Sequence, residues 1–113
     1  MDYELTASIF KALGDPKRVQ IMDILSCGEQ CACDILAYFD FTQPTLSHHM
    51  KVLMQAGLVQ SRKSGTWHHY SLNKEKISEL SAILETLLQN QSDCICHEMA
   101  EGHEACASYP KEK

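Results

Sequence analysis

Hydrophobic positions in the first third of the chain recur every three or four residues, which is the period of an amphipathic helix. Residues 3–13 form the first such segment. Asp15 is a favourable N-cap and Pro16 suits a first helical turn, so a second helix is predicted to begin there and to end before residue 28. Residues 31–39 form a third, shorter apolar segment. The pattern therefore predicts three helices before residue 40.

A fourth helix is predicted from the pattern that follows Thr42. This threonine can cap the helix, and Pro44 falls in the first turn, where no backbone donor is missed. The helix should run to about residue 56, with His49 as a structural histidine beside its buried stripe. The buried stripe of this helix consists of Leu46, Met50 and Leu53. The opposite side has no acidic residue and consists of Pro44, Ser47, His48, Lys51 and Gln55.

An alternating pattern after the fourth helix predicts a β-hairpin. Residues 59–62 and 67–72 are strand-like and are joined by a tight turn. Arg62 and Lys63 should lie near the tip of this hairpin. Trp67 is expected to anchor the hairpin to the body of the domain.

A last helix is predicted from about residue 73 to residue 90. Its apolar stripe is broader than a small domain can cover by itself, so we expect the helix to pair with its mate in a second copy of the chain. The pattern ends beyond residue 91, which divides the chain into a domain over residues 1–91 and a cysteine-containing tail over residues 92–113. The stripe consists of Ile77, Leu80, Ile83, Leu84, Leu87 and Leu88.

The order of four helices, a hairpin and one further helix predicts a mainly α fold, a winged helix-turn-helix. A chain of 113 residues is long enough for one such domain and too short for two. The sequence has no run of 18 apolar residues and no pattern of a secretory signal. We therefore expect a cytoplasmic protein without a membrane partner.

The formal net charge of −5 is unevenly distributed along the chain. Residues 1–41 hold three basic and seven acidic side chains, and residues 77–113 hold two basic and seven acidic ones. Residues 42–76, by contrast, hold five basic side chains, one acidic side chain and four of the six histidines. A polyanion such as nucleic acid can bind this basic segment in spite of the overall charge.

The cysteines form two groups, one in the predicted third helix and one in the tail. In a reducing compartment such clustering favours metal ligation or thiol chemistry over a disulfide framework. The sequence has no Cys-x-x-Cys pair in a βαβ context, no phosphate loop and no Ser-His-Asp order, so we do not expect an enzyme. The six positions are Cys27, Cys31, Cys33, Cys94, Cys96 and Cys106.

Three stretches of the chain together resemble the ArsR/SmtB family of metal-responsive repressors. They read QCACDIL from residue 30, TQPTLSHHMKVL from residue 42 and AGLV from residue 56, and the resemblance covers about residues 7–73. It implies a homodimeric winged-helix repressor that holds operator DNA when metal-free and releases it on binding a toxic metal or metalloid. The sequence Cys31-x-Cys33-Asp34 resembles the sensing motif of the family's arsenic, antimony, cadmium and lead responders.

The chain departs from the family's patterns at the remaining ligand positions. Leu36 stands where the arsenic sensors have a third cysteine. No cysteine or histidine precedes the first helix, where the cadmium and lead branch places further ligands, and residues 74–90 lack the histidines of the zinc and nickel branch. Cys27 is expected mainly to pack. For the third ligand we favour the tail cysteines Cys94 or Cys96 over Cys106 and Cys27.

The spacing of Cys31 and Cys33 places a condition on the site. On an ideal helix these two side chains diverge by about 200°, so one ion can be held by both only if the first turn unwinds. The unpaired backbone N–H groups of a helix start also favour thiolate over thiol. Three sulfurs without an obvious nitrogen partner suit As(III) or Sb(III) better than tetrahedral zinc. The alternative is that both cysteines are small buried hydrophobic residues.

We therefore expect a homodimer that represses an arsenical-resistance operon and leaves its operator on binding As(III) or Sb(III). Two alternatives remain open: a Cd(II)- or Pb(II)-responsive repressor of the same fold, and a small thiol-rich metal-binding protein without a DNA partner. The expected DNA contacts are Gln43, Thr45, Ser47, His48 and Lys51 in the major groove, with Arg62 and Lys63 on phosphates or in the minor groove.

Overall fold

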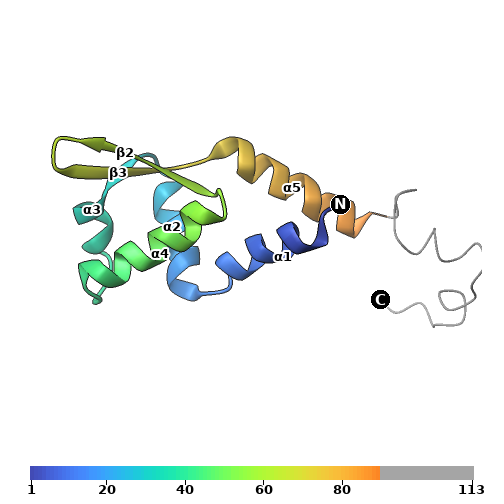
Figure 1. Cartoon of the computed structure of the whole chain (residues 1–113), viewed down its shortest axis with the longest axis horizontal. Coiled ribbons are helices and arrows are strands. Elements are labelled where there is room, and N and C mark those ends of the chain that lie inside the picture. The colour runs from blue at the N-terminus through green and yellow to red at the C-terminus, as the bar shows by residue number, and fades with distance from the viewer. Residues whose placement is uncertain (90–113) are drawn as a thin grey trace, which may run out of the picture. The chain divides into compact units, whose positions relative to one another are not determined.

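The computed structural model describes residues 1–89 and has the predicted winged helix-turn-helix fold (Figure 1). These residues divide into a unit that ends at Leu80 and the part of the last helix that begins at Ser81. All the predicted helices and both predicted hairpin strands are present. The elements are α1 (Tyr3–Ala12), α2 (Pro16–Leu25), β1 (Gln30–Cys31), α3 (Ala32–Leu36), α4 (Gln43–Gln55), β2 (Val59–Ser64), β3 (Trp67–Leu72) and α5 (Lys74–Leu88).

Local sequence sets the starts of α2 and α4. The carboxylate of Asp15 accepts hydrogen bonds from the backbone N–H groups of Lys17 and Arg18 at 2.8 and 3.4 Å, as expected of an N-cap. The bond from Lys17 holds the pKa of Asp15 below its usual range. Thr42 occupies the N-cap position of α4, but its side chain makes no capping bond and lies 3.4 Å from the hydroxyl of Thr45.

The hairpin of β2 and β3 is longer than predicted. Strand β2 continues to Ser64, which pairs with Trp67, so that the turn is reduced to Gly65 and Thr66. Gly65 has a φ of +64°, a conformation that a residue with a side chain rarely adopts. The predicted turn was too long because Lys63 and Ser64 are polar but still pair in the ladder.

A third strand, β1, was not predicted. The sheet has the order β1-β3-β2, and both pairings are antiparallel. Gln30 pairs with Tyr70 and Cys31 pairs with His69. A strand of two residues leaves no periodic signal in the sequence, because its only evidence is its partner. The consequence is that the start of α3 is joined directly to the hairpin.

The hydrophobic core lies between the sheet and the helices α2, α3 and α4, which gather beside the hairpin in Figure 1. The predicted stripe of α4 is confirmed, since Leu46, Met50 and Leu53 are buried. Trp67 does not anchor the hairpin as predicted, because its side chain is 57% exposed. The core consists of Ile9, Ile21, Leu25, Ile35, Leu46, Met50, Leu53, Leu58, Val59, Tyr70 and Leu80.

The last helix, α5, leaves apolar side chains uncovered. Leu80 is buried, whereas Leu84, Leu87 and Leu88 are 44%, 55% and 86% exposed. In a small domain such exposure marks a surface for association. Among residues 1–89, no helix has the length and apolar character needed to cross a membrane.

Candidate functional site

The outward side of α4 carries most of the predicted DNA-contacting residues. Gln43, Ser47, His48 and Lys51 are exposed on this side, and Thr45 is half-buried near the start of the helix. Apolar residues on the other side hold the helix against the core. The helix therefore presents hydrogen-bonding groups and one cation to the solvent, with no carboxylate among its residues.

His49 fixes α4 to the preceding helices, as the prediction of a structural histidine requires. Its side chain is buried, and Nδ1 lies 3.1 Å from Nη1 of Arg18. The Nε atom of Arg18 donates to the carbonyl oxygen of Ala12 at the end of α1, at 2.6 Å. Sequence reasoning missed Arg18, because its partner is 31 residues away. Burial lowers the pKa of His49, which favours the neutral imidazole.

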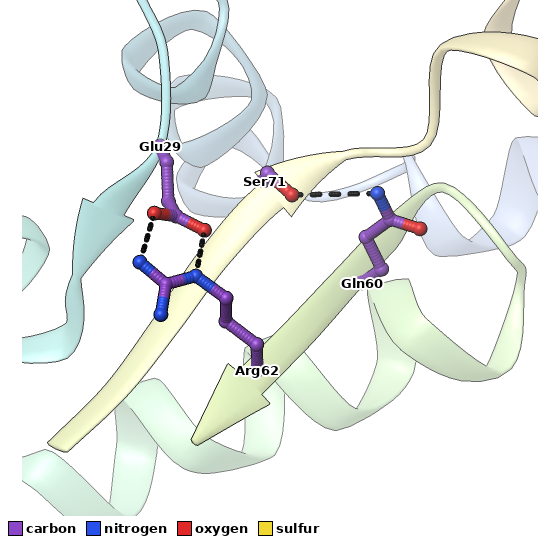
Figure 2. A network of polar contacts seen from close by, with 4 residues as sticks. All are labelled: Glu29, Gln60, Arg62 and Ser71. Atoms are coloured by element: carbon purple, nitrogen blue, oxygen red, sulfur yellow. Dashed lines mark hydrogen bonds and ion pairs between the residues drawn. The ribbon is translucent and has the colours of Figure 1, made fainter. Parts of the chain in front are cut away.

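The two predicted wing cations have different surroundings. Lys63 is exposed on β2, opposite His68. Arg62 reaches across β3 to Glu29, as Figure 2 shows, and its Nε and Nη2 atoms bond the two carboxylate oxygens at 2.9 and 2.8 Å. The bond from Arg62 holds the pKa of Glu29 below its usual range. Arg62 is thus already engaged within the chain, whereas Lys63 is exposed and makes no ion pair among the described residues.

Cys31 and Cys33 come together at the junction of β1 and α3. Cys31 is the N-cap of α3, with an extended backbone (φ −81°, ψ 160°), so the two cysteines are not separated by the angle of a regular helix. Their Sγ atoms are 2.8 Å apart. A carboxylate oxygen of Asp34 lies within 4.8 Å of both sulfurs. The two thiols therefore converge without the unwinding of a helical turn that the sequence analysis required, and a thiophilic ion could be held by both.

The pKa of Cys33 is shifted in the opposite direction from the one that a helix start favours. The hydrogen bond with Cys31 is the main cause of a raised pKa at Cys33, and burial adds to it. The hydrogen bond between the two sulfurs raises the pKa of Cys33 by more than the hydrogen bond from the backbone N–H of Asp34 lowers it. An ion that binds both sulfurs must therefore displace protons.

Of the other cysteines considered as a third ligand, the structure describes only Cys27. Cys27 was expected to pack, but it is exposed and lines an open cleft of about 600 Å³ with Glu29 and Gln60. Cys94 and Cys96, like Cys106, lie outside the residues that the structure describes. His69 was not predicted as a site residue, although its strand position is directly opposite Cys31. Only the register of β1 against β3 reveals this neighbour.

Comparison with known proteins identifies relatives that cover most of the chain. The profile of the bacterial regulatory protein arsR family matches residues 15–61, which cover α2 to the first part of β2. An arsenical resistance operon repressor of Staphylococcus xylosus is 46% identical over 102 residues, which are 90% of this chain and 98% of that protein.

Two solved structures share the fold. A crystal structure of an ArsR family transcriptional regulator superposes with a TM-score of 0.71 and 26% identity, over 80% of this chain and 97% of that one. A homodimeric winged helix-turn-helix DNA-binding domain from Mycobacterium bovis, described as a possible ArsR-family regulator, has a TM-score of 0.64 and 29% identity, over 76% and 80% of the two chains.

Proposed function

The chain belongs to the ArsR family of bacterial regulatory proteins, and from this premise we propose that it represses an arsenical-resistance operon and is induced by As(III) or Sb(III). The observation that carries the proposal is the convergence of the Cys31 and Cys33 thiols, 2.8 Å apart, next to a winged helix-turn-helix. Trivalent arsenic and antimony are thiophilic, so a pair of convergent thiols fits them.

On DNA, the polar side of α4 enters the major groove and the wing lies along the backbone. Gln43, Thr45, Ser47 and His48 supply the hydrogen-bonding groups that can read base edges, and Lys51 adds a cation. Lys63 contacts phosphate, and Arg62 contributes its remaining N–H groups while it holds Glu29.

The repressor acts as a homodimer in this proposal. The exposed leucines of α5 support it, as does the homodimeric state of the Mycobacterium bovis domain. A two-fold dimer sets two recognition helices about 34–36 Å apart on a palindromic operator. DNA affinity then depends on the spacing and the tilt of both copies of α4.

Induction follows from the position of the thiols. An ion that binds Cys31 and Cys33 acts on the β1–β3 pairing and on α3, the first helix of the helix-turn-helix. A shift of α3 changes the support of α4, and a coupling free energy of about 1–3 kcal/mol is typical of linked sites. We assign the third thiolate to Cys94 or Cys96, so that residues 92–113 serve as a ligand-bearing tail attached to the domain of residues 1–91.

The test is a DNA-binding titration at fixed salt concentration with the chain's own promoter region and with a random duplex of equal length. Wild type should bind the promoter more tightly and should release it when arsenite is added. Cys31→Ser and Cys33→Ser should keep the affinity without arsenite and lose the response, whereas the control Cys27→Ser should respond as wild type does. Equal affinity for both duplexes, or release of the Cys31→Ser variant by arsenite, would refute the proposal.

The tail assignment needs its own variants. Cys94→Ser and Cys96→Ser should each be tested alone and together, with Cys106→Ser as the matched control. The double variant should require a higher arsenite concentration for release, because only two thiolates remain. A full response in the double variant would contradict the assignment of the third ligand to the tail.

A further inference from the structure

A pocket of about 300 Å³ opens at the junction of α1, α2 and α4 (Figure 1). Its lining includes Lys11 from α1, Arg18 from α2 and His48 from α4, which are cationic or can become so. No aspartate or glutamate among residues 1–89 lines it. The pocket therefore attracts an anion, because the charged side chains in its wall are all of one sign.

Arg18 is held in place before any ligand arrives. Its Nε donates to the carbonyl oxygen of Ala12 at 2.6 Å, and its Nη1 lies 3.1 Å from Nδ1 of His49. A guanidinium has five N–H donors, and the side chain of Arg18 makes no further hydrogen bond among residues 1–89, so the two donors on Nη2 remain. A planar fork that is already fixed loses little entropy on binding, and its geometry matches that of a phosphate.

The positive charge of the pocket is not neutralised by the acidic residue that acts on Arg18, which is Asp15. Its carboxylate caps α2 by accepting from the backbone N–H groups of Lys17 and Arg18, and it does not line the pocket. Within the described part of the chain, neither Arg18 nor the exposed Lys11 takes part in an ion pair. Both cations are therefore available to a ligand.

The pocket follows one edge of the outward side of α4. His48 and Gln55 are exposed on that side and line the pocket, and Val52 lies between them at helical spacing. A helix with its side chains is about 10–12 Å wide and the major groove is about 12 Å wide, so a helix in the groove brings its edges against the bordering phosphates. The anion that reaches this pocket when α4 reads DNA is therefore a backbone phosphate.

We propose that the pocket binds one phosphate of the operator backbone, with the ammonium group of Lys11 and the Nη2 donors of Arg18 as its ligands. The inference rests on the proposed function, because it takes α4 as the helix that enters the major groove. It adds DNA contacts from α1 and α2, two helices outside the helix-turn-helix and the wing. A phosphate contact of this kind sets the orientation of α4 on the duplex and carries no sequence information.

The salt dependence of DNA binding by the full chain is the first measurement. Lys11→Ala should make the slope of log K against log salt shallower by about one, on promoter and random duplex alike, because one cation no longer neutralises a phosphate. Lys11 is the residue to replace, since a change of Arg18 also breaks its contact with His49. The matched control is Lys74→Ala, which removes an exposed cation that lines the other cleft and should keep the wild-type slope. An unchanged slope in Lys11→Ala, or an equal change in Lys74→Ala, would overturn the inference.

Neutral substitution of single phosphates locates the contact. Each phosphate of one promoter half-site is replaced in turn by a methylphosphonate, and the affinities of wild type, Lys11→Ala and Lys63→Ala are measured. At one position the substitution should weaken wild type and Lys63→Ala equally and Lys11→Ala by less, because one of the two cations at that phosphate is already absent. If no position behaves in this way, Lys11 acts only through its long-range field and the proposed contact is wrong.

Arg18 can be observed without being replaced. In ¹⁵N-labelled protein, the Nη signals of Arg18 should shift when the unmodified promoter is added. They should shift less with the duplex in which the phosphate identified through Lys11 is neutral. Equal shifts with both duplexes, or no shift with either, would contradict the assignment of Arg18 to this phosphate.

Inorganic phosphate has the same chemistry as a backbone phosphate, and a further titration separates the two sources. It is added to the protein without DNA at constant ionic strength. We expect no saturable shift of the Arg18 signals, because a single phosphate contact contributes only a small part of the affinity for DNA. A saturable shift, together with a phosphate scan that finds no position shared with Lys11, would assign the pocket to a free oxyanion and overturn the DNA contact.

Failure of the inference can be told from failure of the proposed function. Lys11→Ala should still prefer the promoter to the random duplex and release it on addition of arsenite, because the base contacts and the thiols are unchanged. If wild type passes both of these tests while the phosphate scan finds no position shared with Lys11, only the pocket is refuted. If wild type has no preference for the promoter, the proposed function fails, and the salt slopes of Lys11→Ala and Lys74→Ala on the random duplex still test the pocket.

Discussion

Arg18 of α2 holds His49 through a contact of 3.1 Å between Nη1 and Nδ1, and this contact joins α4 to α2. A guanidinium can only donate hydrogen bonds, so Nδ1 of His49 is the acceptor and the ring proton is on Nε2. The imidazole is therefore neutral in the folded protein. Protonation of Nδ1 would replace this bond by the repulsion of two cations.

This relationship predicts a loss of stability in mild acid. The pKa of His49 is lowered from its usual 6.5 by burial, so below pH 6.5 the unfolded chain takes up a proton that the folded chain resists. Above pH 6.5, His49 should contribute no pH dependence to the free energy of unfolding, because the residue is neutral in both states. The free energy of unfolding should then fall as the pH drops toward the lower pKa of the folded state. Chemical denaturation between pH 7.5 and pH 5 measures this dependence.

The variant His49→Gln tests the assignment, because glutamine keeps an acceptor and does not titrate. Its stability should be lower than that of wild type at pH 7.5 but should change less between pH 7.5 and pH 5. His68→Gln, an exposed wing histidine, is the matched control and should keep the wild-type pH dependence. An unchanged pH dependence in His49→Gln would show that other groups cause it.

The ion pair of Glu29 and Arg62 predicts an effect on the salt dependence of DNA binding. Glu29→Gln removes the carboxylate that engages two N–H groups of Arg62, so the guanidinium becomes free to contact phosphate. The slope of log K against log salt should become steeper by up to about one. Lys63→Ala should make the slope shallower by about one, for promoter and random duplex alike. A Glu29→Gln slope equal to that of wild type would show that the ion pair with Glu29 does not restrict the contact of Arg62 with DNA.

The outward side of α4 predicts a loss of discrimination between DNA sequences. Ser47→Ala or Gln43→Ala should weaken binding to the promoter by ~1–3 kcal/mol if the residue makes a good base contact, with little change on a random duplex. Ser81→Ala, an exposed serine of α5, is a matched control. Equal weakening on both duplexes would assign Ser47 and Gln43 to the phosphates instead.

The leucines of α5 predict the oligomeric state. Leu84→Glu places a charge on a side chain that is 44% exposed in one chain and that a second copy would bury. Sedimentation equilibrium at micromolar concentration should give twice the chain mass for wild type and a lower average mass for Leu84→Glu. The affinity of Leu84→Glu for the promoter should also be lower, because separate monomers must then bind the two half-sites one at a time. Trp67→Glu should leave the mass unchanged, and a wild-type mass equal to one chain would contradict the dimer.

Local chemistry determined the helices and the buried side of α4 without any knowledge of the fold. Asp15 caps α2, and the three-residue and four-residue spacing of Leu46, Met50 and Leu53 makes one apolar stripe. Hydrophobic periodicity and helix capping depend on residues that are close in the sequence, so the helices they produce can be predicted from the sequence alone. The sequence placed Cys31 inside the third helix and required its first turn to unwind, whereas in the structure Cys31 precedes α3 as its N-cap and no unwinding is needed for the thiols to converge.

Tertiary structure alone decided which distant groups meet. Glu29 and Arg62 are 33 residues apart, and Arg18 and His49 are 31 apart. The pairing of Cys31 with His69 depends on a strand of two residues whose register exists only against β3. The sequence therefore gave no sign that a histidine is the cross-strand neighbour of Cys31. A shift of one residue in that register would turn His69 away and bring the neighbouring side chain opposite Cys31, because successive strand residues point to opposite faces.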